Sequence, residues 1–92
     1  MKVIVTKPTD KQREIMEACP IWEHDAGSFP WKYEQKQETC LILEGKAYVV
    51  GADGNDRADF GAGDLVTFPR HWDCTWTIEE KIRKHYIFDA EV

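Results

Sequence analysis

The sequence predicts an all-β domain, because short β-rich segments alternate with turn residues at regular intervals. Five such segments follow residue 20: TCLIL, KAYVV, DLVTF, CTWTI and KHYIF. Glycine, proline, asparagine and aspartate interrupt the chain between them, which is typical of a β-sandwich or barrel. Four Trp, four Phe and three Tyr supply the large apolar surfaces that a 92-residue domain needs to build a core.

One short helix is expected near the N-terminus, over residues 10–18. Thr9 and Gln12 have the spacing of a capping box, in which each side chain accepts a hydrogen bond from the other residue's backbone amide. Apolar residues follow at helical spacing, and Pro20 ends the segment. This helix is the one departure from an otherwise β-rich pattern.

The whole chain, 1–92, is expected to form one domain. We assign an N-terminal strand and the helix to residues 1–20 and a β-barrel to residues 21–90. Within the barrel, Asp53-Gly54 predicts a hairpin turn, since this pair tolerates the left-handed backbone conformation that tight hairpins require.

Composition excludes several classes of partner. The formal charge of −5 and the absence of a basic run argue against binding a nucleic-acid backbone. No signal peptide is recognisable, and no run of about 18 apolar residues predicts a membrane span. Three cysteines without C-x-x-C spacing indicate neither a disulfide framework nor a zinc knuckle. We therefore expect a cytoplasmic protein with a small-molecule ligand.

Two short motifs carry a resemblance to a known family. Glu38 is followed after six residues by Gly45, and Gly63 is followed after five residues by Pro69, with Cys74 next. These spacings resemble the second half of the first cupin motif and the frame of the second. The segments ETCLILEGKAYV, GDLVTFP, CTW and KHYIF are similar to the small cupins grouped with (S)-ureidoglycine aminohydrolase and the ethanolamine-utilisation cupin domains.

The resemblance covers residues 22–88 and implies a fold, a pocket and an assembly. Cupins are double-stranded β-helix (jelly-roll) barrels whose inner faces enclose a small-molecule site. The expected fold is therefore an all-β cupin barrel with one short N-terminal helix, and the expected assembly is a homodimer. His71 stands where many cupins have glycine, two residues after the motif proline, so the turn there departs from the family pattern.

The family's metal ligands are largely missing. Metal-binding cupins carry three histidines at positions that fall on Trp31, Tyr33 and Cys74, and only the motif glutamate, Glu38, is retained. Imidazoles are what suit iron, zinc or copper sites, and an indole cannot coordinate a cation. We therefore expect no metal cofactor, and the aminohydrolase activity of the named relatives does not transfer.

Strand alternation predicts an aromatic-lined pocket around Glu38. Because alternate residues of a strand share a face, Cys40 and Trp76 are expected to point into the cavity with Glu38, and the cupin resemblance adds Trp31 and Tyr33. These four residues are expected to bind the ligand. Desolvation by aromatic walls disfavours a charged carboxylate, so Glu38 is the first candidate for acid/base chemistry. The alternatives are that Glu38 is a structural carboxylate bonded to the Tyr33 hydroxyl or a backbone amide, and that the aromatics simply fill the barrel.

Two further residues are candidates for catalysis. Cys74 occupies a ligand position of the parent motif and is a possible nucleophile, although buried cysteines often only pack. His85 lies on a predicted strand and points either into the pocket as a partner for Glu38, or outwards while Tyr86 and Phe88 pack inside; the apolar pattern favours the second. The charged run EEKIRK is interpreted as a solvated turn and strand edge.

Three functions fit these observations. The first is a metal-independent cupin that binds a small polar metabolite, with acid/base chemistry by Glu38. The second is a metal-dependent enzyme with an atypical site made of Glu38 and Cys74 with His85 or Tyr33. The third is a non-catalytic dimeric sensor or interaction module.

Overall fold

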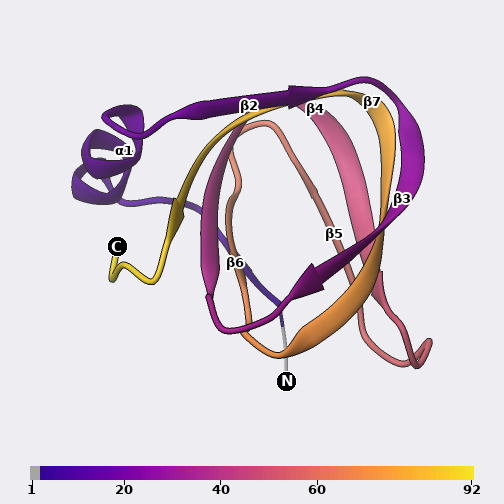
Figure 1. Cartoon of the computed structure of the whole chain (residues 1–92). Coiled ribbons are helices and arrows are strands. Elements are labelled where there is room, and N and C mark those ends of the chain that lie inside the picture. Colours follow the sequence, from indigo (N-terminus) through magenta and orange to yellow (C-terminus); the bar gives the residue numbers. More distant parts are fainter. Residues whose placement is uncertain (1–2) are drawn as a thin grey trace.

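The computed structural model describes residues 3–92, which form a curled antiparallel sheet with one helix against its outer face (Figure 1). The elements are β1 (Ile4–Thr6), α1 (Asp10–Glu17), β2 (Ile21–His24), β3 (Gly27–Tyr33), β4 (Glu38–Gly51), β5 (Arg57–Gly61), β6 (Leu65–Phe68) and β7 (Trp72–Phe88). The strand order is β1-β6-β4-β7-β2, with β3 also paired to β7 and β5 to β4. The predicted all-β barrel with one short helix is confirmed.

Two long strands, β4 and β7, form the centre of the sheet. Each joins two segments that the sequence shows as separate: TCLIL and KAYVV lie in β4, and CTWTI and KHYIF lie in β7. The strands pair with each other from Glu38 opposite Phe88 to Gly51 opposite Cys74. Both strands can therefore contribute to opposite walls of the barrel.

The glycine of the first motif, Gly45, explains how β4 bends. The β4–β7 register shifts between Ile42 and Ala47, and Gly45 in this stretch has φ 96°. A Cβ at Gly45 would overlap the backbone carbonyl oxygen of Lys81. Irregularities of this kind bend a strand and increase its twist, so the motif glycine is needed for the curvature that closes the sheet.

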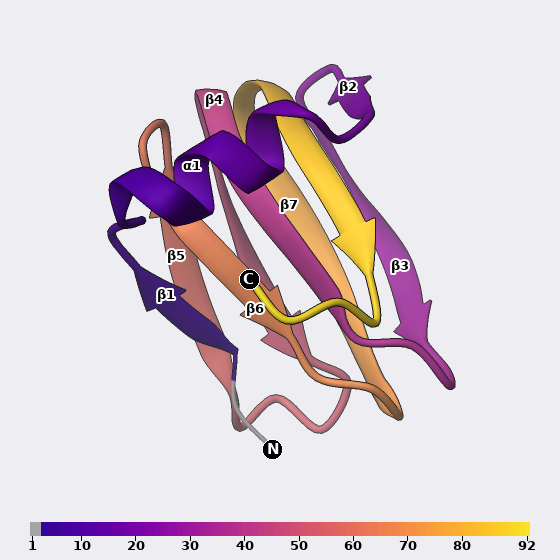
Figure 2. The same cartoon turned by 90° about the vertical axis from the view of Figure 1, so that its left-hand side faces the viewer.

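The helix α1 forms as predicted and covers the outer face of the sheet. The Thr9 hydroxyl oxygen accepts a hydrogen bond from the Gln12 backbone amide at 3.1 Å, and the Gln12 side-chain oxygen accepts one from the Thr9 backbone amide at 2.9 Å. These two bonds complete the capping box. Met16 is fully buried and packs with Leu41 and Leu65. Figure 2 shows α1 lying across the outer side of β4 and β7. No helix in the described part of the chain is long and apolar enough to cross a membrane.

Alternation along the strands separates two cores. Cys40 and Ile42 of β4 face the interior cluster, whereas Leu41 between them faces α1. The interior cluster is rich in aromatic residues, with Phe60 and Phe68 packed against Trp76 at ring-centroid distances of 5.3 Å each. Trp76 of this aromatic layer also lines a pocket, so the layer connects the core with the pocket wall.

Two local features differ from or extend the sequence prediction. Residues 27–30 belong to strand β3, which is not among the five β-rich segments recognised in the sequence. His71, which replaces the family glycine, takes the left-handed conformation with φ 56°, and its amide donates to the Glu34 carbonyl at 2.7 Å. The turn therefore keeps a glycine-like backbone although the residue has a side chain.

Candidate functional site

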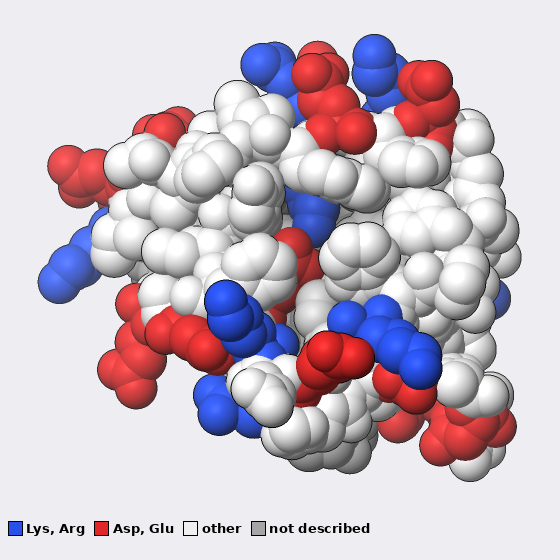
Figure 3. All heavy atoms as spheres, in the orientation of Figure 1, with Lys and Arg blue, Asp and Glu red and all other residues white. Residues whose placement is uncertain are grey.

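A cavity of about 200 Å³ opens at one end of the barrel. Seven of its lining residues are aromatic and two are charged; they are Trp22, Phe29, Trp31, Tyr33, Glu38, Trp76, Lys84, Tyr86 and Phe88. Figure 3 shows a hollow on this face, with an acidic and a basic side chain visible at its bottom between uncharged neighbours. The arrangement is an apolar pocket with a small polar floor, which is the usual form of a small-molecule site.

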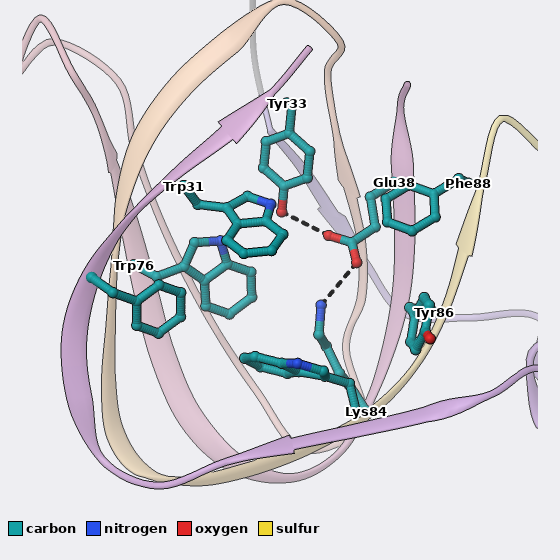
Figure 4. Close-up of a pocket in the computed structure, with 9 residues that line it drawn as sticks. Trp31, Tyr33, Glu38, Trp76, Lys84, Tyr86 and Phe88 are labelled. Carbon is teal, nitrogen blue, oxygen red and sulfur yellow. Dashed lines mark hydrogen bonds and ion pairs between the residues drawn. The ribbon is translucent and has the colours of Figure 1, made fainter. Parts of the chain in front are cut away.

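The floor of the pocket is a hydrogen-bonded triad of Tyr33, Glu38 and Lys84. The Tyr33 hydroxyl donates to Glu38 Oε1 at 2.7 Å, and the Lys84 ammonium lies 3.0 Å from Glu38 Oε2. Figure 4 shows both donors pointing at the carboxylate from opposite sides. All three side chains are almost completely buried, so the carboxylate charge is balanced inside the protein rather than by solvent.

The triad is assembled from three strands by simple alternation. Tyr33 ends β3, Glu38 begins β4, and Lys84 lies on β7 opposite Ile42. Along β7, Lys84, Tyr86 and Phe88 are two residues apart and therefore share the inner face. The pocket lining confirms this pattern, since it includes all three of these residues.

Lys84 is held by more than the ion pair. Its Nζ lies 3.1 Å from Cys40 Sγ and about 5 Å from the ring centroids of Trp22 (5.0 Å) and Trp76 (4.9 Å). An ammonium over an aromatic face is attracted by the negative ring face, and more strongly when both are desolvated. Lys84 therefore occupies an aromatic cage of the kind that binds cations.

Burial and charge act in opposite directions on Lys84. Burial would lower the pKa of Lys84, but the neighbouring Cys40 and Glu38 outweigh it, and the pKa is raised above its usual value. Because Cys40 is a neutral thiol at pH 7, Glu38 is the partner that holds the ammonium charged there. The site thus carries a fixed cation supplied by the protein itself.

The phenol and thiols near the site stay protonated. Burial, followed by the negative charge of Glu38, raises the pKa of Tyr33 above its usual range. Burial also raises the pKa of Cys40 to about 12, against the opposing effect of Lys84, and that of Cys74 to about 12. Since the thiolate is the nucleophilic form, neither cysteine is activated for attack.

The structure brings together four of the residues that the sequence proposed. Trp31, Tyr33, Glu38 and Trp76 all line the pocket. Trp31 is 43% exposed at the mouth, whereas Trp76 is buried. The sequence also allowed Glu38 to be a structural carboxylate that is hydrogen-bonded to the Tyr33 hydroxyl. This hydrogen bond is present, and Glu38 lines an open cavity as well.

Three other candidates lie elsewhere. Cys40 is fully buried behind Lys84 and does not line the cavity, and Cys74 is buried in the interior cluster. His85 faces away from the pocket: its Nδ1 donates to the Cys19 carbonyl at 2.9 Å, beneath the end of α1. The outward orientation of His85, with Tyr86 and Phe88 inside, is therefore the correct alternative.

Lys84 is the functional candidate that the sequence prediction missed. It is the last residue of the run EEKIRK, which we interpreted as solvated; that interpretation is wrong for Lys84, which is only 4% exposed. The signal was present, because Lys84 is in phase with Ile82, Tyr86 and Phe88 on one face of a strand. We interpreted Lys84 as solvated because it is charged, although strand alternation places it on the inner face of the sheet.

The residues at the pocket floor do not fit the metal that many cupins hold. Among residues 3–92, no three His, Cys, Asp or Glu side chains are grouped so that they could hold an ion. Glu38, the one retained ligand, already pairs with the Lys84 ammonium at 3.0 Å. A divalent cation beside that carboxylate would meet the positive charge of Lys84 at close range, so the two cations compete for one place.

Comparison with known proteins agrees with this fold. The sequence of residues 11–86 matches the family model of the EutQ-like cupin domain. A DUF861 family protein from Thermotoga maritima is 44% identical, with a TM-score of 0.85 over 94% of this chain and 98% of that one. No curated protein matches the chain in sequence.

Two more distant structures share the fold alone. A putative ethanolamine utilization protein Q from Salmonella typhimurium is 21% identical, with a TM-score of 0.63 over 94% of this chain and 68% of that one. A DUF1255 protein of unknown function from Acidithiobacillus ferrooxidans is 23% identical, with a TM-score of 0.64 over 71% of this chain and 60% of that one. The family match and the 44% identical structure together establish that this chain belongs to the EutQ-like cupin family.

Proposed function

We propose that this cupin binds a small organic metabolite in its aromatic-lined pocket without a metal, and that Glu38 carries out acid/base chemistry on it. The observation that supports this most strongly is the Lys84–Glu38 pair at the pocket floor, with a donor–acceptor distance of 3.0 Å. A buried carboxylate beside a buried ammonium places a proton acceptor and a hydrogen-bond donor within one ligand's reach. The aromatic walls exclude water from both groups.

The geometry suits an isomerase-type reaction, in which a proton moves from one ligand atom to another. Lys84 would donate a hydrogen bond to a ligand oxygen on which negative charge develops, as donors in oxyanion sites do. Glu38 would take a proton from a neighbouring ligand atom and return it to another. Such a transfer is redox-neutral and needs no further cofactor. Cys74 and His85 lie outside the pocket and have no role in this proposal.

Solvent exchange of a small carbonyl compound tests the acid/base role. The full-length, metal-free protein would be incubated with cyclohexanone in heavy water, and deuterium uptake beside the carbonyl followed by NMR. We expect Glu38→Gln to lower the protein-dependent rate by about 10²- to 10⁴-fold, the usual contribution of a general base. Glu34→Gln is the matched control, since Glu34 is exposed and outside this pocket. Equal rates in wild type and Glu38→Gln would remove the catalytic role.

Metal analysis tests the other half of the proposal. Tag-free protein and the variants Glu38→Ala and Cys74→Ala would be purified without added ions and measured by plasma mass spectrometry. We expect no stoichiometric metal in any of the three. A stoichiometric metal in the wild type that both substitutions remove would favour the metal-dependent reading and overturn ours.

We also propose that the protein forms a homodimer. Among the described residues, β1 pairs with β6 alone, so one edge of this strand carries no partner strand. Ile4 and Val5 on β1 are 56% and 37% exposed, which makes the edge apolar as well as open. Analytical ultracentrifugation should show a dimer, and Val5→Lys should shift it to monomer; a monomeric wild type would contradict the proposal.

A further inference from the structure

We infer that the pocket selects an uncharged, planar ligand of about one ring in size that presents a hydrogen-bond acceptor next to a donor, as an amide or lactam does. This inference rests on the proposed function and names the ligand class for the same site. It follows from four properties of the pocket: its volume, its walls, its charge and the hydrogen-bonding capacity left at its floor.

Volume and walls set the size and shape. A cavity of about 150 Å³ holds benzene, so about 200 Å³ accommodates one six-membered ring with a substituent. Phe29 and Trp76 are nearly parallel, with an interplanar angle of 7° and a centroid distance of 6.2 Å. They are direct partners across β3 and β7, so the two rings lie side by side in one wall, and a flat ligand can stack on that wall.

The charge of the pocket excludes cationic ligands. Aromatic walls with a carboxylate would ordinarily attract an ammonium group. Here that position is filled, because the Lys84 ammonium lies over both Trp22 and Trp76 and contacts Glu38. A second cation would face Lys84 at short range in a desolvated site.

The same pair disfavours anions. Glu38 and Lys84 are the two charged residues in the lining, and their charges cancel. An anion would have to give up its hydration without a free counter-charge and would lie beside the Glu38 carboxylate. An uncharged ligand avoids both costs.

The hydrogen bonds left over at the floor define the polar pattern. A lysine ammonium has three N–H donors, and two of those of Lys84 are directed to Glu38 and Cys40. A carboxylate has about four lone-pair sites, and Tyr33 and Lys84 use two of those on Glu38. One donor on Lys84 and about two acceptor sites on Glu38 therefore remain for a ligand with the complementary pair.

Four ring-sized probes test this inference against full-length, metal-free protein at pH 7. They are 2-pyridone, which is a neutral lactam, N-methyl-2-pyridone, in which the donor is blocked, benzoate and benzylamine. We expect 2-pyridone to bind at least about 10-fold more tightly than each of the others, because each of these leaves a buried polar group unpaired or adds an uncompensated charge. Titration calorimetry gives the four dissociation constants.

A pair of variants separates the floor from the walls. Glu38→Gln should remove the preference for 2-pyridone over its N-methyl form, whereas Glu34→Gln should leave it unchanged. Benzoate or benzylamine binding as tightly as 2-pyridone would overturn the inference about ligand class while leaving a metal-free organic pocket in place. Binding of none of the four would overturn the proposed function and, with it, this inference.

Discussion

Two ion pairs in this protein have almost the same geometry and opposite surroundings. Lys84 and Glu38 lie 3.0 Å apart with side chains 5% and 6% exposed. Arg57 and Asp59 lie 2.9 Å apart with side chains 56% and 60% exposed. Distance alone would rank them as equals. The charges of the outer pair are hydrated whether or not the two side chains pair, so the pair adds little stability. Each charge of the inner pair is removed from water and is stabilised mainly by the opposite charge.

Removing one member of the inner pair should have the largest effect. Lys84→Met keeps most of the side-chain volume but leaves the Glu38 carboxylate buried without a charged partner. We expect the free energy of unfolding at pH 7 to fall by about 3–5 kcal/mol, as for other broken buried pairs. Urea denaturation measures the change. Arg57→Met, the matched substitution in the outer pair, should produce no resolvable change.

A double variant distinguishes the charge from the packing. Lys84→Met combined with Glu38→Gln removes both charges, so it should recover most of the stability that Lys84→Met loses. A Lys84→Met protein as stable as Arg57→Met would contradict the importance that we assign to the buried pair.

The second-largest expected effect is a loss of stability at alkaline pH, caused by the buried groups Cys40 and Lys84. The pKa of Cys40 is raised to about 12 in the folded protein, so folding favours the protonated thiol, and stability is lost as the pH rises from the unfolded value near 9 towards 12. The pKa of Lys84 is also raised, so its contribution is complete below the unfolded value and is lost as the pH rises through the folded one. The expected loss is on the order of 1 kcal/mol per pH unit for each buried thiol above pH 9.

Urea midpoints between pH 7 and 11 test this expectation. Cys40→Ala should make the decline above pH 9 shallower, even if it also lowers stability at every pH by leaving a small cavity. The outer pair titrates outside this window, because the pKa of Asp59 is lowered and that of Arg57 is raised by their mutual hydrogen bond. A flat profile up to pH 11 would show that burial does not keep the thiols protonated.

Salt should have the smallest effect on stability, but it should distinguish the exposed ion pair from the buried one. At 1 M ionic strength the Debye length is about 3 Å, which screens exposed charges but scarcely reaches buried ones. Any destabilisation by Asp59→Asn at low salt should therefore vanish in 1 M sodium chloride, whereas that by Lys84→Met should persist. Equal salt dependence of the two variants would place the inner pair in contact with solvent.

The fold could be predicted from the sequence because its signals are local. The capping box at Thr9 and Gln12, the turn at Gly54 and strand β6 all follow from nearby residues and are present. Strand β3 escaped prediction because Gly27 and Pro30 signal turns. Pro30 is tolerated because β3 pairs on one side with β7 and shows no second partner strand among the described residues.

The site could be predicted only in part, because its polar floor depends on contacts between distant residues. Glu38 and the aromatic residues follow from the motif frame and alternation. The role of Lys84 depends on Cys40, Trp22 and Trp76 surrounding its ammonium, and no sequence spacing specifies that arrangement. Without those partners, a lysine in a charged run is correctly expected to be solvated.

Strand β7 has a consequence for the order in which the molecule acquires its structure. It pairs with β2, β3 and β4, so three strands that precede it in the chain share one late partner. Apart from the β4–β5 hairpin, the pairings of the sheet therefore close long loops, and topologies of this kind fold in milliseconds to seconds rather than microseconds. Until residues 72–88 are in place, the aromatic faces of β2 and β3 have no sheet to join. The chain is then most exposed to association with other unfolded chains.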